Sequence, residues 1–377
     1  MSANPIPIYQ GQDFYVPMFQ VKVQGRQPGQ DVIRDIQEVT YKDDIEQVDS
    51  FEIAINNWDA GDLTFKYSDQ NLFDPGKQIE LWMGYRGQDS LRLMMKGEIT
   101  QLRPDFPASG QPTLSISGLN LLHRFRGKQQ SQAYRGMKDS AIARQVGQRL
   151  GVTMDTDPNA EAGEVQNDYI LQNNQYDLLF LMERARNNGY DLVVRETGQN
   201  GSSQPSRLYF GPSVNLKHVT YRLTWGKSLI QFQPTLSTSK QVGQVVVQSW
   251  STSSKKAITA TATRSDITTR GVGSKGGEAD LEKSFKDRQE VIAHHPVQTE
   301  AEAKKVASQT LEQIAKGMLT GRGSTVGLPD LRAGSILIID RLGTRFSGRY
   351  FVTSTTHTIG DGGYTTEFEC RREELQS

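Results

Sequence analysis

The sequence predicts a mainly β protein with an α+β insertion, in which two β-rich halves bracket a small mixed module. Apolar residues fall at every second position through much of residues 15–120, which is the period of strands with one buried face. Between about residues 127 and 220 the period becomes that of helices, and strand-like segments return beyond residue 220. We therefore place the domain boundaries at 1–126, 127–220 and 221–377.

The first half reads as antiparallel β-structure. Its four clearest apolar runs are Phe19-Val21-Val23, Phe51-Ile53-Ile55, Ile79-Leu81-Met83-Tyr85 and Leu114-Ile116-Gly118. Polar residues occupy the opposite face, which is typical of a sheet with one side on a core. Trp82 stands on that polar face, so we expect a second buried surface there.

The central module alternates helices and strands. Asp139 and Ser140 are suited to cap a helix that Gly151 ends, and a second helix runs from near Asn174 to Asn188-Gly189. Strands are predicted next, over residues 190–194 and 207–210.

The second half returns to strands, with one helix. Strands are predicted over residues 243–250, 257–262, 335–340 and 350–354. The segment 265–290 has almost no large apolar residues, so we expect a flexible loop. Thr299 and Glu302 form the capping box of a helix over 299–317. The chain then closes in a β-hairpin around Gly360-Asp361-Gly362-Gly363.

Composition narrows the classes of function. The 377 residues carry 43 basic and 43 acidic side chains without a long run of one sign, which argues against nucleic acid as the main partner. The short basic stretch Arg124–Lys128 reads as a solvated strand end. Cys370 is the only cysteine, which excludes an intramolecular disulfide and predicts a buried thiol in a protein folded in a reducing cytoplasm. No stretch of 18 apolar residues predicts a membrane span, and no signal peptide is expected.

The motifs with possible chemistry are weak. Gly271–Gly276 matches G-x-G-x-x-G, but neither a strand before it nor a helix after it is predicted, so we expect a loop that binds no nucleotide. The five histidines are His123, His218, His294, His295 and His357, and no pair has the spacing of a metal site. His357 lies in a predicted strand and reads as structural. We therefore predict no catalytic, cofactor-binding or metal-binding residues.

Pairs of carboxylates leave two alternatives open. Asp43, Asp44 and Asp59 lie near Trp58, an aromatic residue on which a sugar could stack. A peptidoglycan hydrolase using Asp44 and Asp59 is one alternative, since glycoside hydrolysis needs two carboxyl groups across a cleft. A glycan-binding tail protein or adhesin is the other.

A series of segments, in order along the chain, resembles one known family. The segments are Val48–Asn57, Phe73–Gly76, Ile79–Tyr85, Gly97–Ile99, Gly334–Asp340, Phe346–Tyr350 and the closing stretch Gly348–Arg372. In order and spacing they resemble the phage late control D family of tail hubs and the hub part of type VI secretion spike proteins.

The resemblance implies a structural baseplate hub and not an enzyme. In this family three subunits each contribute two tube-like β-barrel domains, and the resulting ring joins a six-fold tail tube to a three-fold spike. Such a ring would carry apolar residues on its nominal outer face, for which Trp82 is the example.

The resemblance also implies partners and a location. The spike is expected on a separate chain, because type VI spike proteins continue into further domains where this chain stops at Ser377. We expect the tail tube protein and other baseplate components as further partners. Assembly is expected in the bacterial cytoplasm, followed by incorporation into the baseplate of a virion tail, a tailocin or an injection particle.

Overall fold

The computed structural model describes the chain except residues 1–4, 9–15, 88–90, 197, 200–201, 204, 213–219, 252–254, 268, 271–277, 294–296, 298 and 376–377. The glycine-rich motif Gly271–Gly276 lies outside the described residues, as do His218, His294 and His295. Within the described residues, none of the helices is both long enough and apolar enough to cross a membrane.

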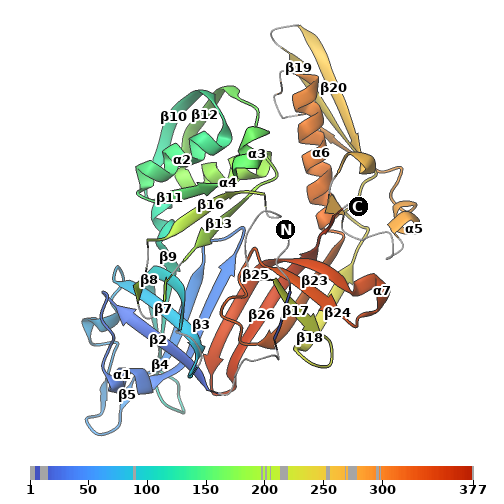
Figure 1. Cartoon of the computed structure of the whole chain (residues 1–377). Coiled ribbons are helices and arrows are strands. Elements are labelled where there is room, and N and C mark those ends of the chain that lie inside the picture. The colour runs from blue at the N-terminus through green and yellow to red at the C-terminus, as the bar shows by residue number, and fades with distance from the viewer. Residues whose placement is uncertain are drawn as a thin grey trace.

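A 13-stranded sheet forms the base of the molecule (Figure 1). The first half supplies β2 (Pro17–Val23), β3 (Ile36–Asp44), β4 (Ser50–Asn56), β7 (Gln78–Tyr85), β8 (Arg92–Asp105) and β9 (Thr113–Asn120). The second supplies β17 (Thr220–Thr224), β18 (Leu229–Leu236), β23 (Leu319–Val326), β24 (Ile336–Asp340), β25 (Gly348–Gly360) and β26 (Gly363–Arg372), and β1 (Ile6–Pro7) is added beside β17. The mainly β prediction is therefore confirmed.

The two halves meet at strand β25. One side of β25 pairs with β26, while the other pairs with β24 through Gly348–Phe351 and with β3 through Ser354–Ile359. The halves thus share one branched sheet, whose described strands end at β1, β2 and β18 without closing into a barrel. The sequence could not predict this, because alternation identifies a strand but does not name its partners.

The closing hairpin belongs to both cores. Gly360 pairs with Gly363, whose φ of 95° suits the tight turn between β25 and β26. Tyr364 packs in the core of the first half and Phe368 in the core of the second, where the buried Cys370 also lies. The predicted hairpin and the predicted buried thiol are both confirmed.

The central module packs two main helices between small sheets. Its elements are β10 (Gln129–Met137), α2 (Asp139–Leu150), β11 (Thr153–Thr156), α3 (Pro158–Ala162), β12 (Asn167–Tyr176), α4 (Asp177–Asn187), β13 (Asp191–Arg195), β14 (Gly198–Gln199), β15 (Ser202–Ser203) and β16 (Arg207–Gly211). Gly151 ends α2 as predicted, with a φ of 70°. The cap of α2 is Lys138, and Asp139 and Ser140 both lie inside the helix. The carboxylate of Asp139 binds Arg184 and Asn188, and the Ser140 hydroxyl donates a hydrogen bond to Glu164. Helix α4 starts at Asp177 and not near Asn174, because β12 extends through Tyr176.

A third unit stands beside this module above the large sheet (Figure 1). It consists of β19 (Gln244–Ser251), β20 (Lys256–Thr263), β22 (Gln289–Ile292) and helix α6 (Glu300–Lys316), with α5 (Glu278–Glu282) below. The Thr299 hydroxyl accepts a hydrogen bond from the Glu302 amide at 3.2 Å, which confirms the predicted start of α6. The described residues of the segment 265–290 include α5 and the start of β22, which pairs with β19.

Short elements complete the fold. They are α1 (Gln30–Asp35), β5 (Trp58–Asp59), β6 (Thr64–Phe65), η1 (Asn71–Phe73), η2 (Leu121–Arg126), η4 (Arg264–Asp266), β21 (Thr269–Arg270), α7 (Gly343–Phe346) and β27 (Glu374–Leu375).

Candidate functional site: a polar sheet face and the pocket beside it

The face of the large sheet that points away from the cores is polar across both halves. Two rows of paired residues cross it from strand to strand. The first row is Gln231, Ser324, Glu367, Thr356 and Lys42. The second is Thr365, Thr358, Thr40, Glu52, Ser117 and Gln101. We call this surface the polar sheet face.

Charges on the polar sheet face are mixed and mostly paired across strands. Arg322 lies 2.9 Å from Glu369, and Arg103 lies 3.1 Å from Glu52. These side chains are exposed, so the pairs add little to stability. The face is thus hydrated and close to neutral, and the expected apolar outer face is not found along these rows.

Trp82 is buried, as the expected second buried surface predicts, but it is buried within the subunit and not on a surface for another chain. A register shift follows Leu81 in the pairing of β7 with β8, and the Trp82 side chain is completely buried within the subunit. Its indole Nε1 donates a hydrogen bond to Glu80 at 3.3 Å, and the Lys22 ammonium lies 5.5 Å from its ring centroid. Trp82 is therefore not available for contact with another subunit.

A buried ion pair joins the two halves beneath the sheet face. Arg332 Nε lies 2.9 Å from the carboxylate of Asp43, which is 5% exposed. The same guanidinium donates to the carbonyl of Met94 at 2.7 Å and lies 4.6 Å from the ring centroid of Tyr41. Asp43 also accepts hydrogen bonds from the amide of Ala333 and from the hydroxyl of Thr355. Each of these contacts of Asp43 joins parts of the fold to one another.

His357 is held in the same region. Its side chain is fully buried, with Nδ1 3.0 Å from the Tyr364 hydroxyl and Nε2 3.0 Å from the carbonyl oxygen of Leu331. Burial lowers the pKa of His357 to about 4, so the ring is neutral at pH 7. These contacts agree with the structural role predicted for His357. Within the described residues, no group of three or more His, Cys, Asp or Glu side chains could hold a metal ion.

The acid pair Asp44 and Asp59 does not come together. Asp44 ends β3 beside the start of β4, whereas Asp59 follows the far end of β4. The seven residues of β4 separate the two by about 20 Å, against the 5 to 10 Å that glycoside hydrolysis requires. Asp59 instead accepts backbone hydrogen bonds from Gly61 and Asp62, which lower its pKa. Asp44 and Asp59 therefore cannot form the acid pair of the proposed peptidoglycan hydrolase.

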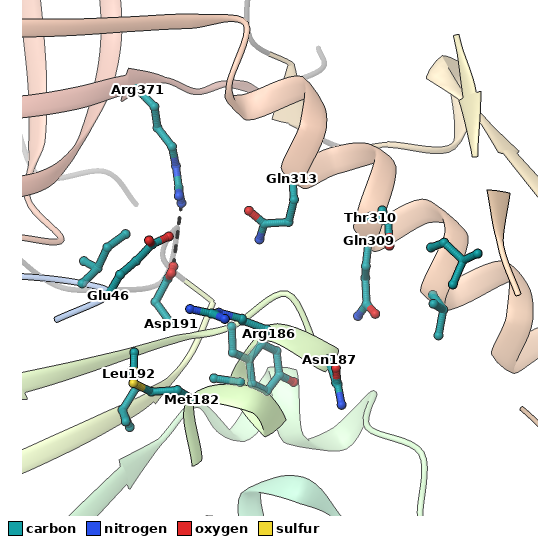
Figure 2. Close-up of a pocket in the computed structure, with 15 residues that line it drawn as sticks. Glu46, Met182, Arg186, Asn187, Asp191, Leu192, Gln309, Thr310, Gln313 and Arg371 are labelled. Carbon is teal, nitrogen blue, oxygen red and sulfur yellow. Dashed lines mark ion pairs between the residues drawn. The ribbon is translucent and has the colours of Figure 1, made fainter. Parts of the chain in front are cut away.

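A pocket of about 470 Å³ lies between the central module and helix α6. Figure 2 shows side chains of α4, β13, α6 and β26 converging on it. Its apolar lining includes Met182, Leu192, Val306 and Ile292, and its polar lining is Glu46, Arg186, Asn187, Asp191, Gln309, Thr310, Gln313 and Arg371. Arg371 pairs with Asp191 across the pocket at 3.9 Å.

The pocket opens towards the polar sheet face. A second hollow of about 720 Å³ shares Ile45, Glu46, Gln313 and Arg371 with it. That hollow extends over Gln233, Arg322 and Glu369, which belong to the sheet face. The two hollows adjoin at these shared residues, and we call them together the α6 groove.

Sequence reasoning missed the residues of the α6 groove. Arg371 carried one signal, because it continues the outward phase of Thr365, Glu367 and Glu369 on β26. Gln309 and Gln313 stood on the polar side of a predicted amphipathic helix, where polar residues are ordinary. Only the approach of α6 to the central module makes them line a groove.

The sequence comparison assigns a family. The family described as the Alg8 N-terminal domain matches residues 14–361. The chain belongs to this family. None of the curated proteins matches the chain.

Solved structures with a similar fold are phage tail and type VI secretion proteins. The 43 kDa tail protein of prophage MuSo2 from Shewanella oneidensis has a TM-score of 0.70 at 13% identity, covering 94% of this chain and 98% of that chain. The tail protein from Neisseria meningitidis MC58 has a TM-score of 0.66 at 14% identity, covering 95% and 97%. The E. coli c3393 protein, described as a type VI secretion component similar to T4 gp27 and gp5, has a TM-score of 0.54 at 9% identity, covering 95% and 77%. This chain thus has a fold found in phage tail proteins.

Proposed function

We propose that this protein is the structural baseplate hub of a contractile tail or injection machine. The observation that carries the proposal is a fold shared over 94% of the chain with a phage tail protein. The segments that resemble late control D hubs, from Val48–Asn57 to the closing hairpin, support the more specific role of hub. In this role the protein performs no catalysis and needs no cofactor.

We further propose that three subunits form a ring that adapts a six-fold tube to a three-fold spike. Two β-rich halves in each subunit, 1–126 and 221–377, would give six related units in such a ring. The described sheet ends in open edges at β1, β2 and β18, and an open edge is a surface that neighbouring chains cover. The polar sheet face is suited to line the hydrated interior of the ring.

The proposed ring has two ends, and we assign a different partner to each. One end of the ring would dock a separate spike protein, and the other would present six similar surfaces to the tail tube. Other baseplate components would surround it. Assembly would take place in the bacterial cytoplasm before incorporation into a tail baseplate or an injection particle.

Native mass spectrometry tests the oligomer. In the presence of the cognate tube and spike proteins, three chains of 42.1 kDa should give a species of 126.3 kDa or its complexes. Detection of the 42.1 kDa monomer alone would contradict the proposal. Lysis of cell-wall material in zymography would instead favour a hydrolase.

An exposed apolar residue on the edge strand β18 supplies a variant, and Trp225 is exposed just before this strand. Trp225 is 57% exposed and Ile230, on β18, is 60% exposed. We expect Ile230→Lys to fold normally but to weaken the trimer by an order of magnitude or more, because it places a charge in the lateral contact. Leu63→Lys, at a site that is 73% exposed on the opposite half, is the control and should leave the trimer intact.

A further inference from the structure

Three parts of the molecule meet at one cluster of buried charges. The cluster consists of Asp191 of the central module, Arg371 and Glu373 at the end of the closing hairpin, and Lys316 in the last turn of α6. All four side chains are at most 14% exposed. We call this cluster the clasp, because it links the central module, the large sheet and α6.

The links within the clasp differ in length. Arg371 Nε lies 2.8 Å from Glu373 Oε1, and the Arg371 guanidinium lies 4.7 Å from the ring centroid of Phe351 on β25. The backbone N–H of Glu373 donates to the carbonyl of Arg349 at 3.3 Å, so this pair is fixed to the large sheet. In contrast, Arg371 Nη2 lies 3.9 Å from Asp191, beyond the range of a hydrogen bond. The clasp is therefore weakest where it reaches the central module.

Helix α6 and its small sheet are anchored to the large sheet. Met318 and Leu319, which directly follow α6, are buried in the core of the second half, and so is Phe285 behind α5. Strand β27 pairs with β21, and β21 lies against α6. These elements and the large sheet thus move as one body.

The central module is held less firmly. It has a core of its own, separate from the core under α6, and a small apolar cluster with Val193, Tyr209 and Phe351 joins it to the large sheet. Towards α6, Asn188 Oδ1 accepts a hydrogen bond from Lys305 Nζ at 3.2 Å, and the pocket of about 470 Å³ lies between the two units. Units that meet at a small polar interface are expected to move relative to each other.

The closed position also carries a cost. Arg371 Nη2 and Glu373 Oε2 are buried and have no hydrogen-bond partner among the residues that the structure describes. Buried polar atoms without partners are unfavourable, because they have lost their hydrogen bonds to water. Movement of the central module away from Arg371 would let water reach Nη2. The contacts of the clasp therefore only partly offset the free energy of closing.

We propose that the clasp is a conformational device, which holds the central module against α6 and opens to let the module swing away as one body. The pivot is the apolar cluster of Val193, Tyr209 and Phe351. Opening separates Asp191 from Arg371 and Asn188 from Lys305, and it widens the α6 groove. The movement takes place within one subunit, so this proposal does not depend on ring formation.

Two pairs of spin labels on the full-length protein test the movement. Glu183→Cys on α4 with Ala301→Cys on α6 is the moving pair, and Ala301→Cys with Glu367→Cys on β26 is the reference pair. All three sites are exposed, whereas the native Cys370 is buried and should not be labelled. The labelled chain is diluted into unlabelled chain, so that pulsed electron paramagnetic resonance measures distances within one subunit.

Matched variants connect the movement to the clasp. Asp191→Asn with Lys305→Met weakens both ties of the central module. We expect the ratio of long to short distances in the moving pair to rise about tenfold, the change expected for two polar contacts, while the reference pair stays the same. Asp280→Asn with Lys283→Met makes the same two changes at an exposed ion pair on α5 and should leave both label pairs unchanged.

Three outcomes would overturn the proposal. An unchanged moving pair in the Asp191→Asn, Lys305→Met variant would show that these contacts do not hold the module. An equal change in the reference pair would show that α6 is not fixed to the sheet. Loss of the helical circular dichroism would show that the module has no stable core apart from α6. Native mass spectrometry of the trimer can succeed or fail independently of all three.

Discussion

At the scale of single residues, the buried pair of Asp43 and Arg332 decides how the two halves are joined. Asp43 comes from β3, and Arg332 from the segment before β24. Neither side chain could remain buried as an ion without the other, because transfer of a lone charge from water costs several kcal/mol. The pair therefore fixes the halves in one relative position.

We expect Arg332→Leu to destabilise the protein by about 3–5 kcal/mol, because Asp43 would remain buried without its counter-ion. The free energy of unfolding in urea measures the effect. Arg322→Leu is the matched control: its pair with Glu369 is exposed, so its effect should be no more than about 1 kcal/mol. Similar losses for the two variants would show that Asp43 does not need Arg332.

Three titratable groups, the buried Asp49 and His357 and the half-buried Glu196, give stability a defined pH dependence. Burial raises the pKa of Asp49 to about 8 and the pKa of Glu196 to about 7, whereas it lowers the pKa of His357 to about 4. A carboxyl group whose pKa is raised by folding stabilises the folded protein at low pH. This stabilisation is lost as pH rises through the pKa of the group in the folded state. The lowered pKa of His357 contributes stability above pH 6.5 that is lost as pH falls towards 4.

Between pH 6.5 and 8.5 only the two carboxyl groups act, so we expect stability to fall as pH rises through this window. Urea midpoints across the window measure the change. Glu196→Gln should make the dependence shallower, because it removes one of the two titrations. A midpoint that is constant or rises with pH would contradict this assignment.

At the scale of elements, the hairpin of β25 and β26 is the centre of the fold. It carries Tyr364 into the first core and Phe368 into the second, and β25 pairs with strands of both halves. Gly323 lies directly under Phe368, where a Cβ atom would come within 2.5 Å of the ring. The hairpin is therefore closely packed from both sides.

Truncation before Gly348 should give insoluble protein, because it exposes both cores and the edges of β3, β23 and β24. Phe368→Ala is the milder test, with an expected loss of about 3–5 kcal/mol for a buried aromatic residue. Glu367→Ala, next to it on the exposed face, should change stability by about 0.5 kcal/mol or less. A soluble, cooperatively unfolding truncated chain would contradict the shared-core assignment.

At the scale of the whole molecule, the large sheet is a base from which two smaller units rise (Figure 1). The central module and the α6 unit touch at a few contacts, such as Lys305 Nζ with the Asn188 carbonyl oxygen Oδ1 at 3.2 Å. The α6 groove lies beside this contact and opens to the polar sheet face.

The sequence by itself determined the elements and their class. Alternation in Phe51-Ile53-Ile55, the glycine turn at Gly360–Gly363 and the stop at Gly151 are local signals, because each depends on the chirality or periodicity of a few neighbouring residues. The burial of Cys370 also followed from its position in an alternating strand.

Only the tertiary structure decided how these elements combine. The pairing of β25 with β3 and the distance between Asp44 and Asp59 depend on contacts between residues far apart in the chain. The α6 groove is of the same kind, since its amides are ordinary polar residues until α6 meets the central module. Local sequence sets the period of an element, whereas partner choice follows from the free energy of the whole packed chain.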